Sequence, residues 1–291
     1  MSSSRSLTRS GLIKLFSLLF VLAGGMTALE AQESPNQGNI SLSAGTNFTT
    51  AYYFRGRFQE DEGIISQPWA EVGTTLYDGG NSSLSANVGL WWSLHSEHTG
   101  DGASTQGRSA VYEEDVYGGL SYTYSNLSFG LSYVFFTSPN DAFTTVEEIN
   151  YSISYDDSDA LGDFALSPSL TIADETDIHG GGNEAIYAEL GVSPGTTIAE
   201  KSNYPVSVSL PTTVGLSVDD YYSDSSGDEE FFGYLKIGPH VSVPLASETQ
   251  WGSWTLSAGV DYYLLSADSL ETLNNGDDSE VEGTISLSMS Y

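Results

Sequence analysis

A regular alternation of apolar and polar residues runs through most of the chain after residue 39. In the segment 39–55, Ile40, Leu42 and Phe48 fall on one face, whereas Ser41 and Ser43 fall on the other. A period of two is the pattern of a β-strand whose two faces meet different surroundings. No segment of comparable length has the period of a helix. The chain is therefore predicted to be all-β.

Most of the alternating segments approach the roughly 9–11 residues that cross a bilayer at a tilt. Their predicted bounds are 39–55, 67–77, 82–95, 112–124, 127–137, 146–155, 164–174, 184–192, 206–218, 231–245, 254–265 and 280–291. Tight connections alternate with long ones, as periplasmic turns alternate with external loops in outer-membrane barrels. The polar face carries Ser, Thr, Gly and Asn rather than the Lys and Glu of a solvated sheet. This composition indicates that the apolar face is the one in contact with lipid. We predict a transmembrane antiparallel up-and-down β-barrel of about 12 strands.

Both ends of the chain indicate export to the bacterial outer membrane. Arg5, Arg9 and Lys14 precede an apolar stretch and then small residues, which predicts a signal peptide over 1–31. A short periplasmic tail over 32–38 and a barrel over 39–291 would follow. The last strand ends on Tyr291 with alternating apolar residues before it, which resembles the signal that the barrel-assembly machinery reads. Outer-membrane lipid and that machinery are the expected partners.

The composition limits the remaining partners. A net charge of -31 with eight Lys and Arg argues against nucleic acid, because phosphates are bound by basic side chains. Aromatic residues make up 12% of the chain, which a disordered acidic chain would lack. There is no cysteine, so no disulfide forms. We expect no cofactor.

Three prolines lie inside predicted strands. Pro168, Pro211 and Pro239 lack the amide donor that a closed barrel requires at every wall position. We expect them to mark bulges or places where the predicted register is wrong. The stretch 193–205 is also long for a periplasmic turn.

Several stretches of the first half resemble a known group. YYFRGRFQ (52–59), WWS (91–93), EEDVYGGLSY (113–122), YVFFTSP (133–139) and EEINYSISY (147–155) are similar to the Gcw_chp group of uncharacterised outer-membrane proteins, which share a Y-x-F-R-G opening strand. The likeness covers roughly residues 42–155 and fades beyond them. It implies a small outer-membrane barrel and no established activity.

Arg55 is the most informative single residue. If the even-numbered residues of the first strand face lipid, Arg55 faces the lumen, where a guanidinium can bridge two carboxylates. We hypothesise an ion-pair network of Arg55 with Glu71, Glu113 or Asp115. The alternative is a solvated arginine at the rim beside Glu60, Asp61 and Glu62, and Arg57 is expected at that rim. The predicted pore-lining residues are Arg55, Glu71, Glu113, Asp115, Glu148, Glu189, Lys236, His240, Asp261 and Glu282.

The inward residues are mostly small, so either water fills the lumen or a loop such as 96–111 or 266–279 folds in. A water-filled lumen ringed by carboxylates favours an outer-membrane diffusion pore for small solutes with a preference for cations. The alternative is a non-conducting structural or surface-interaction barrel. A membrane hydrolase is disfavoured, since none of the four histidines stands clearly beside a serine on the lipid face. Asp174, Asp177 and His179 could bind a metal, but a flexible loop is the preferred interpretation and no metal site is predicted.

Overall fold

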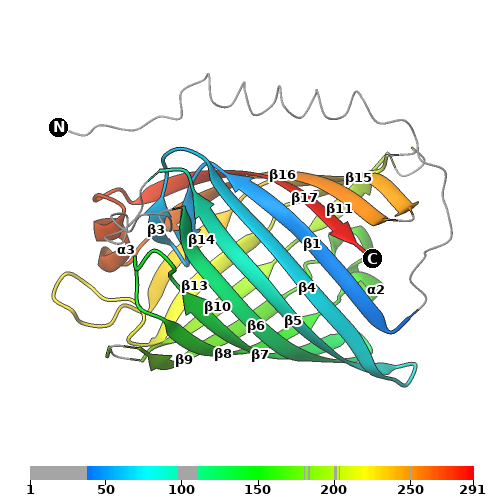
Figure 1. Cartoon of the computed structure of the whole chain (residues 1–291), viewed down its shortest axis with the longest axis horizontal. Coiled ribbons are helices and arrows are strands. Elements are labelled where there is room, and N and C mark those ends of the chain that lie inside the picture. Colours follow the sequence, from blue (N-terminus) through cyan, green and yellow to red (C-terminus); the bar gives the residue numbers. More distant parts are fainter. Residues whose placement is uncertain are drawn as a thin grey trace.

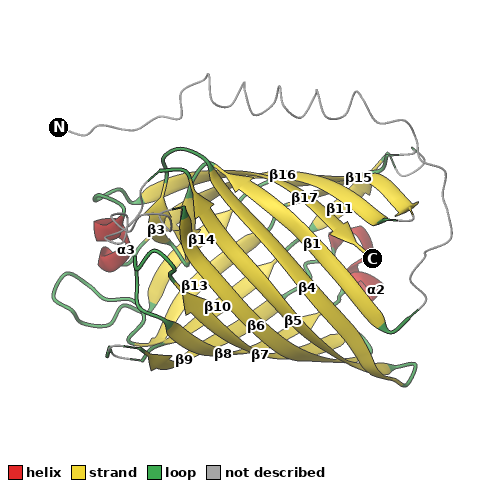
Figure 2. Cartoon of the chain, in the orientation of Figure 1, coloured by secondary structure: helices red, strands yellow, loops and turns green. Residues whose placement is uncertain are grey.

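The computed structural model describes residues 38–97, 110–179, 181–182, 184–199, 202, 204–249 and 251–291. The predicted signal peptide and all but the last residue of the predicted tail lie outside these residues. The described chain forms a closed antiparallel barrel of 12 wall strands, which confirms the predicted fold class (Figure 1). Figure 2 shows the strands as one continuous wall with loops at both ends.

Nine wall strands run unbroken. They are β1 (Ile40–Thr49), β4 (Ile65–Asp78), β5 (Ser82–His95), β6 (Val111–Tyr124), β7 (Leu127–Thr137), β8 (Val146–Tyr155), β9 (Ser169–Ile178), β16 (Gly252–Leu265) and β17 (Ser279–Ser290). Three wall strands are broken in two: β10 (Ile186–Val192) with β11 (Gly195–Ile198), β12 (Val206–Ser209) with β13 (Thr212–Asp219), and β14 (Phe232–Ile237) with β15 (His240–Thr249). The remaining elements are β2 (Tyr52–Phe54), β3 (Arg57–Glu60), α2 (Ser158–Leu161), η2 (Gly162–Phe164) and α3 (Asp268–Leu273).

The barrel closes between its first and last strands. β1 pairs with β4 on one side and with β17 on the other, where Ala44 lies opposite Met289. Both β1 and β17 therefore have two neighbours, and no free sheet edge is left there. We call the end that carries α3 the long-loop end and the end that carries the C-terminus the short-turn end (Figure 1).

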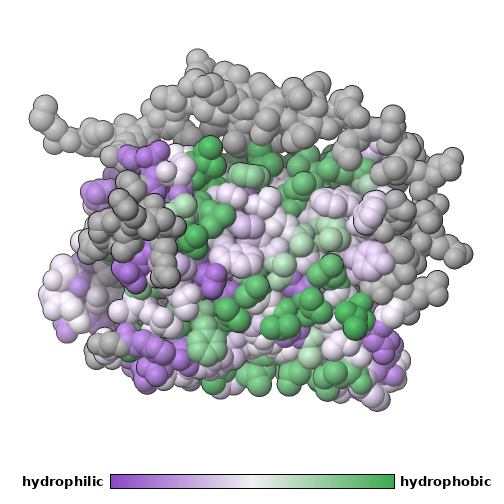
Figure 3. Space-filling model, in the orientation of Figure 1, coloured by the Kyte–Doolittle hydropathy of each residue, from purple (hydrophilic) through white to green (hydrophobic). Residues whose placement is uncertain are grey.

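The outer surface of the wall is apolar. Ile40, Leu42 and Phe48 are exposed, whereas Thr49 is buried on the lumen side, so the predicted alternation of β1 is confirmed. Apolar side chains spread over the middle of the visible wall, and hydrophilic ones gather at the long-loop end (Figure 3). An exposed apolar belt of this extent is what a lipid-facing barrel presents. Among the described residues, no helix combines the length and apolar character needed to cross a membrane.

Prolines interrupt three neighbouring wall strands at one level. The carbonyls of Pro194, Pro211 and Pro239 lie in the breaks and accept hydrogen bonds from the backbone N–H groups of Leu210, Gly238 and Val260 on the following strands. The missing donors are thus accommodated by gaps in the ladder, as predicted for Pro211 and Pro239. The breaks at Pro211 and Pro239 each separate the two halves of one predicted strand. Beyond the break at Pro194, β11 lies in the stretch 193–205, so the prediction of a turn over that stretch is wrong there.

Predicted strand limits are wrong in two segments. The segment 164–174 begins too early, because α2 and η2 occupy 158–164 and Pro168 precedes the first residue of β9. It also ends too early, because β9 continues to Ile178, so Asp174 and Asp177 lie in a strand and not in the predicted flexible loop. The first segment, 39–55, extends too far, because β1 ends at Thr49 and the chain then turns into the lumen. The residues with the strongest motif therefore leave the wall.

Aromatic side chains in the lumen lie over glycines on the adjacent strand. Tyr117 is directly opposite Gly89, Tyr234 is opposite Gly215 and His240 is opposite Gly259. A Cβ on each of these glycines would collide with the facing ring. The glycines therefore make room for the rings that fill the lumen.

We expect Gly215→Val to push the ring of Tyr234 out of place. Tyr234 is buried and shares a hydrogen bond of 2.9 Å with Tyr187, so crowding it should destabilise the barrel by about 1–3 kcal/mol. Urea unfolding in lipid vesicles measures the change. The control is Gly118→Ala in β6, where the nearest atom to an added Cβ is the carbonyl oxygen of Asn87 at 3.4 Å. Equal stability of Gly215→Val and Gly118→Ala would contradict this account.

Candidate functional site: the arginine clamp at the long-loop end

The β2–β3 hairpin folds from the wall into the lumen. Its strands pair through Phe54 and Arg57, which leaves Arg55 and Gly56 as a two-residue tip. Both tip residues have positive φ, 51° at Arg55 and 78° at Gly56. This is the left-handed backbone that such tight hairpin turns require, and it is costly for a side chain as large as arginine. The turn places the guanidinium among the lumen side chains.

Arg55 is clamped by Glu148 of β8. Its Nη1 and Nη2 atoms donate to Oε2 and Oε1 of Glu148, both at 2.8 Å. The side chain of Glu148 is 1% exposed and that of Arg55 is 12% exposed, so the pair is almost wholly removed from water. A two-pronged contact of this kind fixes both the distance and the orientation of the hairpin relative to the wall.

Aromatic rings surround the clamp. The guanidinium carbon of Arg55 lies 4.4 Å from the ring centre of Tyr187 and 4.8 Å from that of Phe54. Nη1 also donates to the hydroxyl of Tyr221 at 3.2 Å. Burial lowers the pKa of Arg55, but the contacts with Tyr221 and Glu148 outweigh it and hold that pKa well above its ordinary value. The arginine therefore stays charged.

The backbone of the tip is fixed as well. The hydroxyl of Tyr222 donates to the carbonyl of Arg55 at 3.0 Å, and Nδ2 of Asn274 donates to the carbonyl of Gly56 at 3.2 Å. A Cβ on Gly56 would come within 2.9 Å of the side chain of Leu270 in α3. Segments 219–231 and 266–279 thus close over the hairpin, and the second of them is one of the two loops expected to fold in. Most of the other, 96–111, lies outside the described residues.

Two groups of buried residues hold the hairpin on either side. One is rich in tyrosine and contains Tyr53, Tyr187, Tyr222, Tyr234 and Tyr263. The other contains Tyr52, Ile65 and Tyr112, with Phe54 and Trp91 packed against it. Of the two alternatives left open for the lumen, water or an inward-folding loop, the long-loop end shows the second: the loop 266–279 covers the hairpin, and tyrosines fill the space around it.

The predicted network has a different partner. The structure joins Arg55 to Glu148, not to Glu71, Glu113 or Asp115. The alternative of a solvated rim arginine is also wrong, since Arg55 is buried among aromatic rings. Arg57 does not lie free at the rim either: its Nη2 donates to the carbonyl of Tyr221 at 2.7 Å.

Glu113 and Asp115 lie side by side on the lumen face of β6. The hydroxyl of Tyr52 donates to Oε2 of Glu113 at 2.8 Å, and burial, together with Glu113 and Asp115, raises the pKa of Tyr52. Oδ1 of Asp115 is buried without a hydrogen-bond partner among the described residues. These carboxylates are therefore concentrated beside the hairpin without an arginine of their own.

The remaining predicted pore-lining residues also face the lumen, but they form separate small groups. Glu71 accepts from Nδ2 of Asn87, and Glu189 accepts from the hydroxyl of Tyr187. Glu282 accepts hydrogen bonds from the hydroxyls of Thr49 and Tyr263. The ammonium of Lys236 lies 5.7 Å from the ring centre of Tyr263. Nε2 of His240 lies 3.0 Å from Oδ1 of Asp261. The structure does not bring these residues together with the clamp.

Cavities in the described part of the lumen include two that glutamates line. A cavity of 210 Å³ beside the hairpin is lined by Arg57, Glu113, Glu148 and Glu175, together with aromatic residues. A second, of 410 Å³, lies toward the short-turn end and is lined by Glu71, Asn87 and small residues such as Ser121. Carboxylates therefore contribute to both spaces.

Sequence reasoning missed Glu175, Tyr221 and Tyr222. Glu175 lies one residue beyond the predicted end of its strand, in the stretch that was expected to be a flexible loop. Tyr221 and Tyr222 lie in an acidic loop that has no strand periodicity. The inward tyrosines of the wall did leave a signal, because Tyr187 alternates with Glu189 and thus shares its face.

A serine and a histidine also meet in the lumen wall. Oγ of Ser93 lies 2.8 Å from Nε2 of His95, two residues along β5. The two residues are 0% and 2% exposed, and the imidazole stacks on Tyr112 with ring centres 4.6 Å apart. A buried pair with no approach for substrate serves packing rather than nucleophilic attack.

No family model matches the chain, and no curated protein matches it. The resemblance to the Gcw_chp group therefore stays a prediction. Among solved structures, the chain is similar to an outer membrane channel from Pseudomonas putida F1, at 11% identity over 91% of this chain and 100% of that chain, with a TM-score of 0.48. It is also similar to the β-domain of the Bordetella autotransporter BrkA, at 11% identity over 88% and 99% with a TM-score of 0.45. A further similar structure is the NanC porin, at 11% identity over 86% of this chain and 98% of that chain, with a TM-score of 0.42. With TM-scores below 0.5, these likenesses carry no functional argument, and the residues of this chain must supply it.

Proposed function

We propose that this chain is an outer-membrane pore for small solutes that prefers cations and that is narrowed at its long-loop end by the β2–β3 hairpin. The observation that carries the proposal is the set of carboxylates facing the lumen cavities, namely Glu71, Glu113, Glu148 and Glu175. A water-filled passage walled by carboxylates attracts cations and repels anions.

The balance of charge supports a cation preference. The basic groups that the described residues place in the lumen are Arg55, Arg57, Lys236, His95 and His240. Arg55 is neutralised by Glu148, His240 lies against Asp261, and His95 shares a hydrogen bond with Ser93. Within the described part of the chain, Glu71, Glu113 and Asp115 form no ion pair with a basic group. The electrostatic potential along the passage is therefore negative.

The hairpin supports the narrowing. It lies between two aromatic groups and is joined to the wall at its tip, so it occupies the mouth as one rigid piece. The cavity of 210 Å³ is lined on one side by the hairpin and on the other by β6 to β9 and the loops beside them. It is the space through which small ions pass in this proposal.

A non-conducting barrel is the second candidate, and the tyrosines packed around Arg55 favour it. Tyr187 and Tyr222 are 2% and 0% exposed, which is the packing of a protein core rather than of a pore wall. In that case the acidic loops would act at the surface and the lumen would serve only as a scaffold.

The bacterial outer membrane is the location that goes with this proposal, because the wall presents an apolar belt to its surroundings. The barrel-assembly machinery remains the proposed partner of the last strand, β17, and outer-membrane lipid that of the belt. We infer no enzymatic activity, since the Ser93–His95 pair is closed to substrate.

Current through the refolded, heat-modifiable protein in a planar bilayer tests the function. Under a potassium chloride gradient we expect discrete openings with a reversal potential toward that of potassium, because the lumen carboxylates exclude chloride. A double variant, Glu113→Gln with Glu175→Gln, should move the reversal potential toward zero. Glu62→Gln, in the exposed loop before β4, is the control and should leave it unchanged. A folded but silent barrel would reject the pore and support the second candidate.

A further inference from the structure

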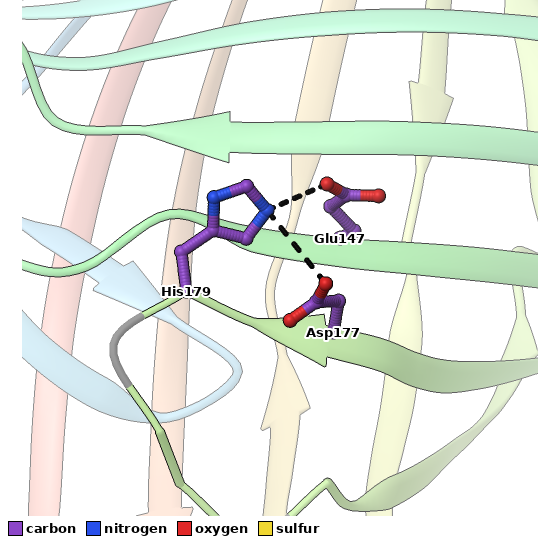
Figure 4. A group of neighbouring side chains, drawn as sticks. All are labelled: Glu147, Asp177 and His179. Carbon is purple, nitrogen blue, oxygen red and sulfur yellow. Dashed lines mark hydrogen bonds and ion pairs between the residues drawn. The ribbon is translucent and has the colours of Figure 1, made fainter.

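Glu147, Asp177 and His179 meet on the outer face of the barrel at the long-loop end (Figure 4). Nε2 of His179 lies 2.7 Å from Oε1 of Glu147 and 3.9 Å from Oδ2 of Asp177. The three potential ligand atoms all lie within 4.8 Å of one another. None of these groups belongs to the arginine clamp or to the lumen cavities.

A β-bulge brings the three side chains together. Glu147 pairs with Asp177 and the next residue, Glu148, pairs with Glu175, so Thr176 is the extra residue of β9. Without the extra residue, Glu175 and Asp177 would face the same side of the wall. With it, Glu175 points into the lumen while Asp177 and His179 join Glu147 outside. Bulges of this kind re-aim side chains at barrel rims.

The arrangement leaves negative charge that the protein does not balance. Glu147 and Asp177 are direct cross-strand partners, and like charges in that position destabilise a sheet. Among the described residues, no Lys or Arg forms an ion pair with either carboxylate, and the donors that reach Glu147 are His179 and the hydroxyl of Tyr133. The backbone N–H of His179 donates to the carbonyl of Thr145 at 2.9 Å, which holds the imidazole at this position. A bound cation would offset the repulsion.

We propose that Glu147, Asp177 and His179 form a binding site for a divalent first-row transition-metal ion, with Zn²⁺ as the representative. One imidazole and two carboxylates are ligands that Zn²⁺ accepts, whereas Ca²⁺ and Mg²⁺ prefer oxygen ligands alone. His179 and Asp177 are exposed, so water or an external ligand can complete the coordination. The ion would join β8 to β9 beside Glu148, which holds the clamp on the opposite face of the same strand.

Calorimetric titration of the refolded protein with Zn²⁺ tests the site, in buffer with excess Mg²⁺ to occupy the acidic loops. We expect saturable binding of one ion per chain. His179→Gln and Asp177→Asn should each weaken it by about tenfold or more, as loss of a ligand does. Zn²⁺ should also raise the unfolding temperature of the wild type and not that of His179→Gln, because an ion that binds only the folded state stabilises it.

The matched control is His240→Gln. His240 also contacts a carboxylate, Asp261 at 3.0 Å, but lies outside the proposed ligand set, so its variant should bind Zn²⁺ as the wild type does. Each protein is first shown to be folded by its heat-modifiable mobility. The proposal is rejected if the folded wild type shows no saturable binding or if His179→Gln binds Zn²⁺ with unchanged affinity.

Discussion

Replacing Arg55 with alanine is expected to lower the free energy of unfolding by about 3–5 kcal/mol, because it leaves the buried carboxylate of Glu148 without its partner. The same change should raise the single-channel conductance, since the hairpin loses its attachment to β8. Urea unfolding in lipid vesicles gives the first quantity and planar-bilayer recording gives the second.

Two further variants distinguish the loss of the ion pair from a general destabilisation of the barrel. The double variant Arg55→Met with Glu148→Met removes both charges, and a buried pair replaced by apolar residues costs little stability in many proteins. It should therefore be more stable than Arg55→Ala. Arg57→Ala removes an arginine that contacts the carbonyl and the ring of Tyr221 and forms no ion pair within the described residues, so its effect should be smaller. An Arg55→Ala protein with unchanged stability and conductance would reject the clamp.

Removing the hairpin should have the largest effect on conductance. Thr49 and Ile65 lie directly opposite each other in the wall, so an Asn-Gly turn can replace residues 50–64 without changing the register of β1 and β4. We expect a several-fold increase in single-channel conductance, because the widest obstruction of the long-loop mouth is gone. The preference for cations should persist, since Glu113, Glu175 and Glu71 remain.

The control for this deletion shortens a different loop at the same end. Residues 225–228 form the exposed tip of the loop after β13, and replacing them with two glycines leaves the hairpin in place. That variant should conduct like the wild type. If the two deletions gave the same conductance as the unaltered protein, the hairpin would not be the obstruction.

The barrel itself could be predicted from the sequence because period-two alternation is local. Each wall strand shows its two faces within about ten residues, and Ile40, Leu42 and Phe48 face outward as expected. The proline breaks were visible for the same reason: Pro211 and Pro239 lack a donor wherever they lie. What alternation cannot show is where a strand leaves the wall, and so the continuation of β1 into the hairpin was missed.

The clamp was harder to predict because its partners are far apart in the sequence. Arg55 and Glu148 were both expected to face the lumen, but several carboxylates shared that face and only the closed barrel decides which one is nearest. The positive φ of Arg55 is also invisible in the sequence, although the glycine that follows it is typical of a tight turn. Asp177 and His179 were noticed as possible ligands, whereas Glu147 could be added only once the bulge at Thr176 was known.

The clamp also sets an order of events in folding. Arg55 reaches across 93 positions of sequence to Glu148 and across 166 to Tyr221, and Asn274 lies 218 positions from Gly56. Contacts that close such long stretches of chain form slowly. The β2–β3 hairpin is therefore fully held only once segment 266–279, which lies just before β17, is in place. We predict that barrels recorded immediately after insertion lose conductance slowly as the hairpin docks.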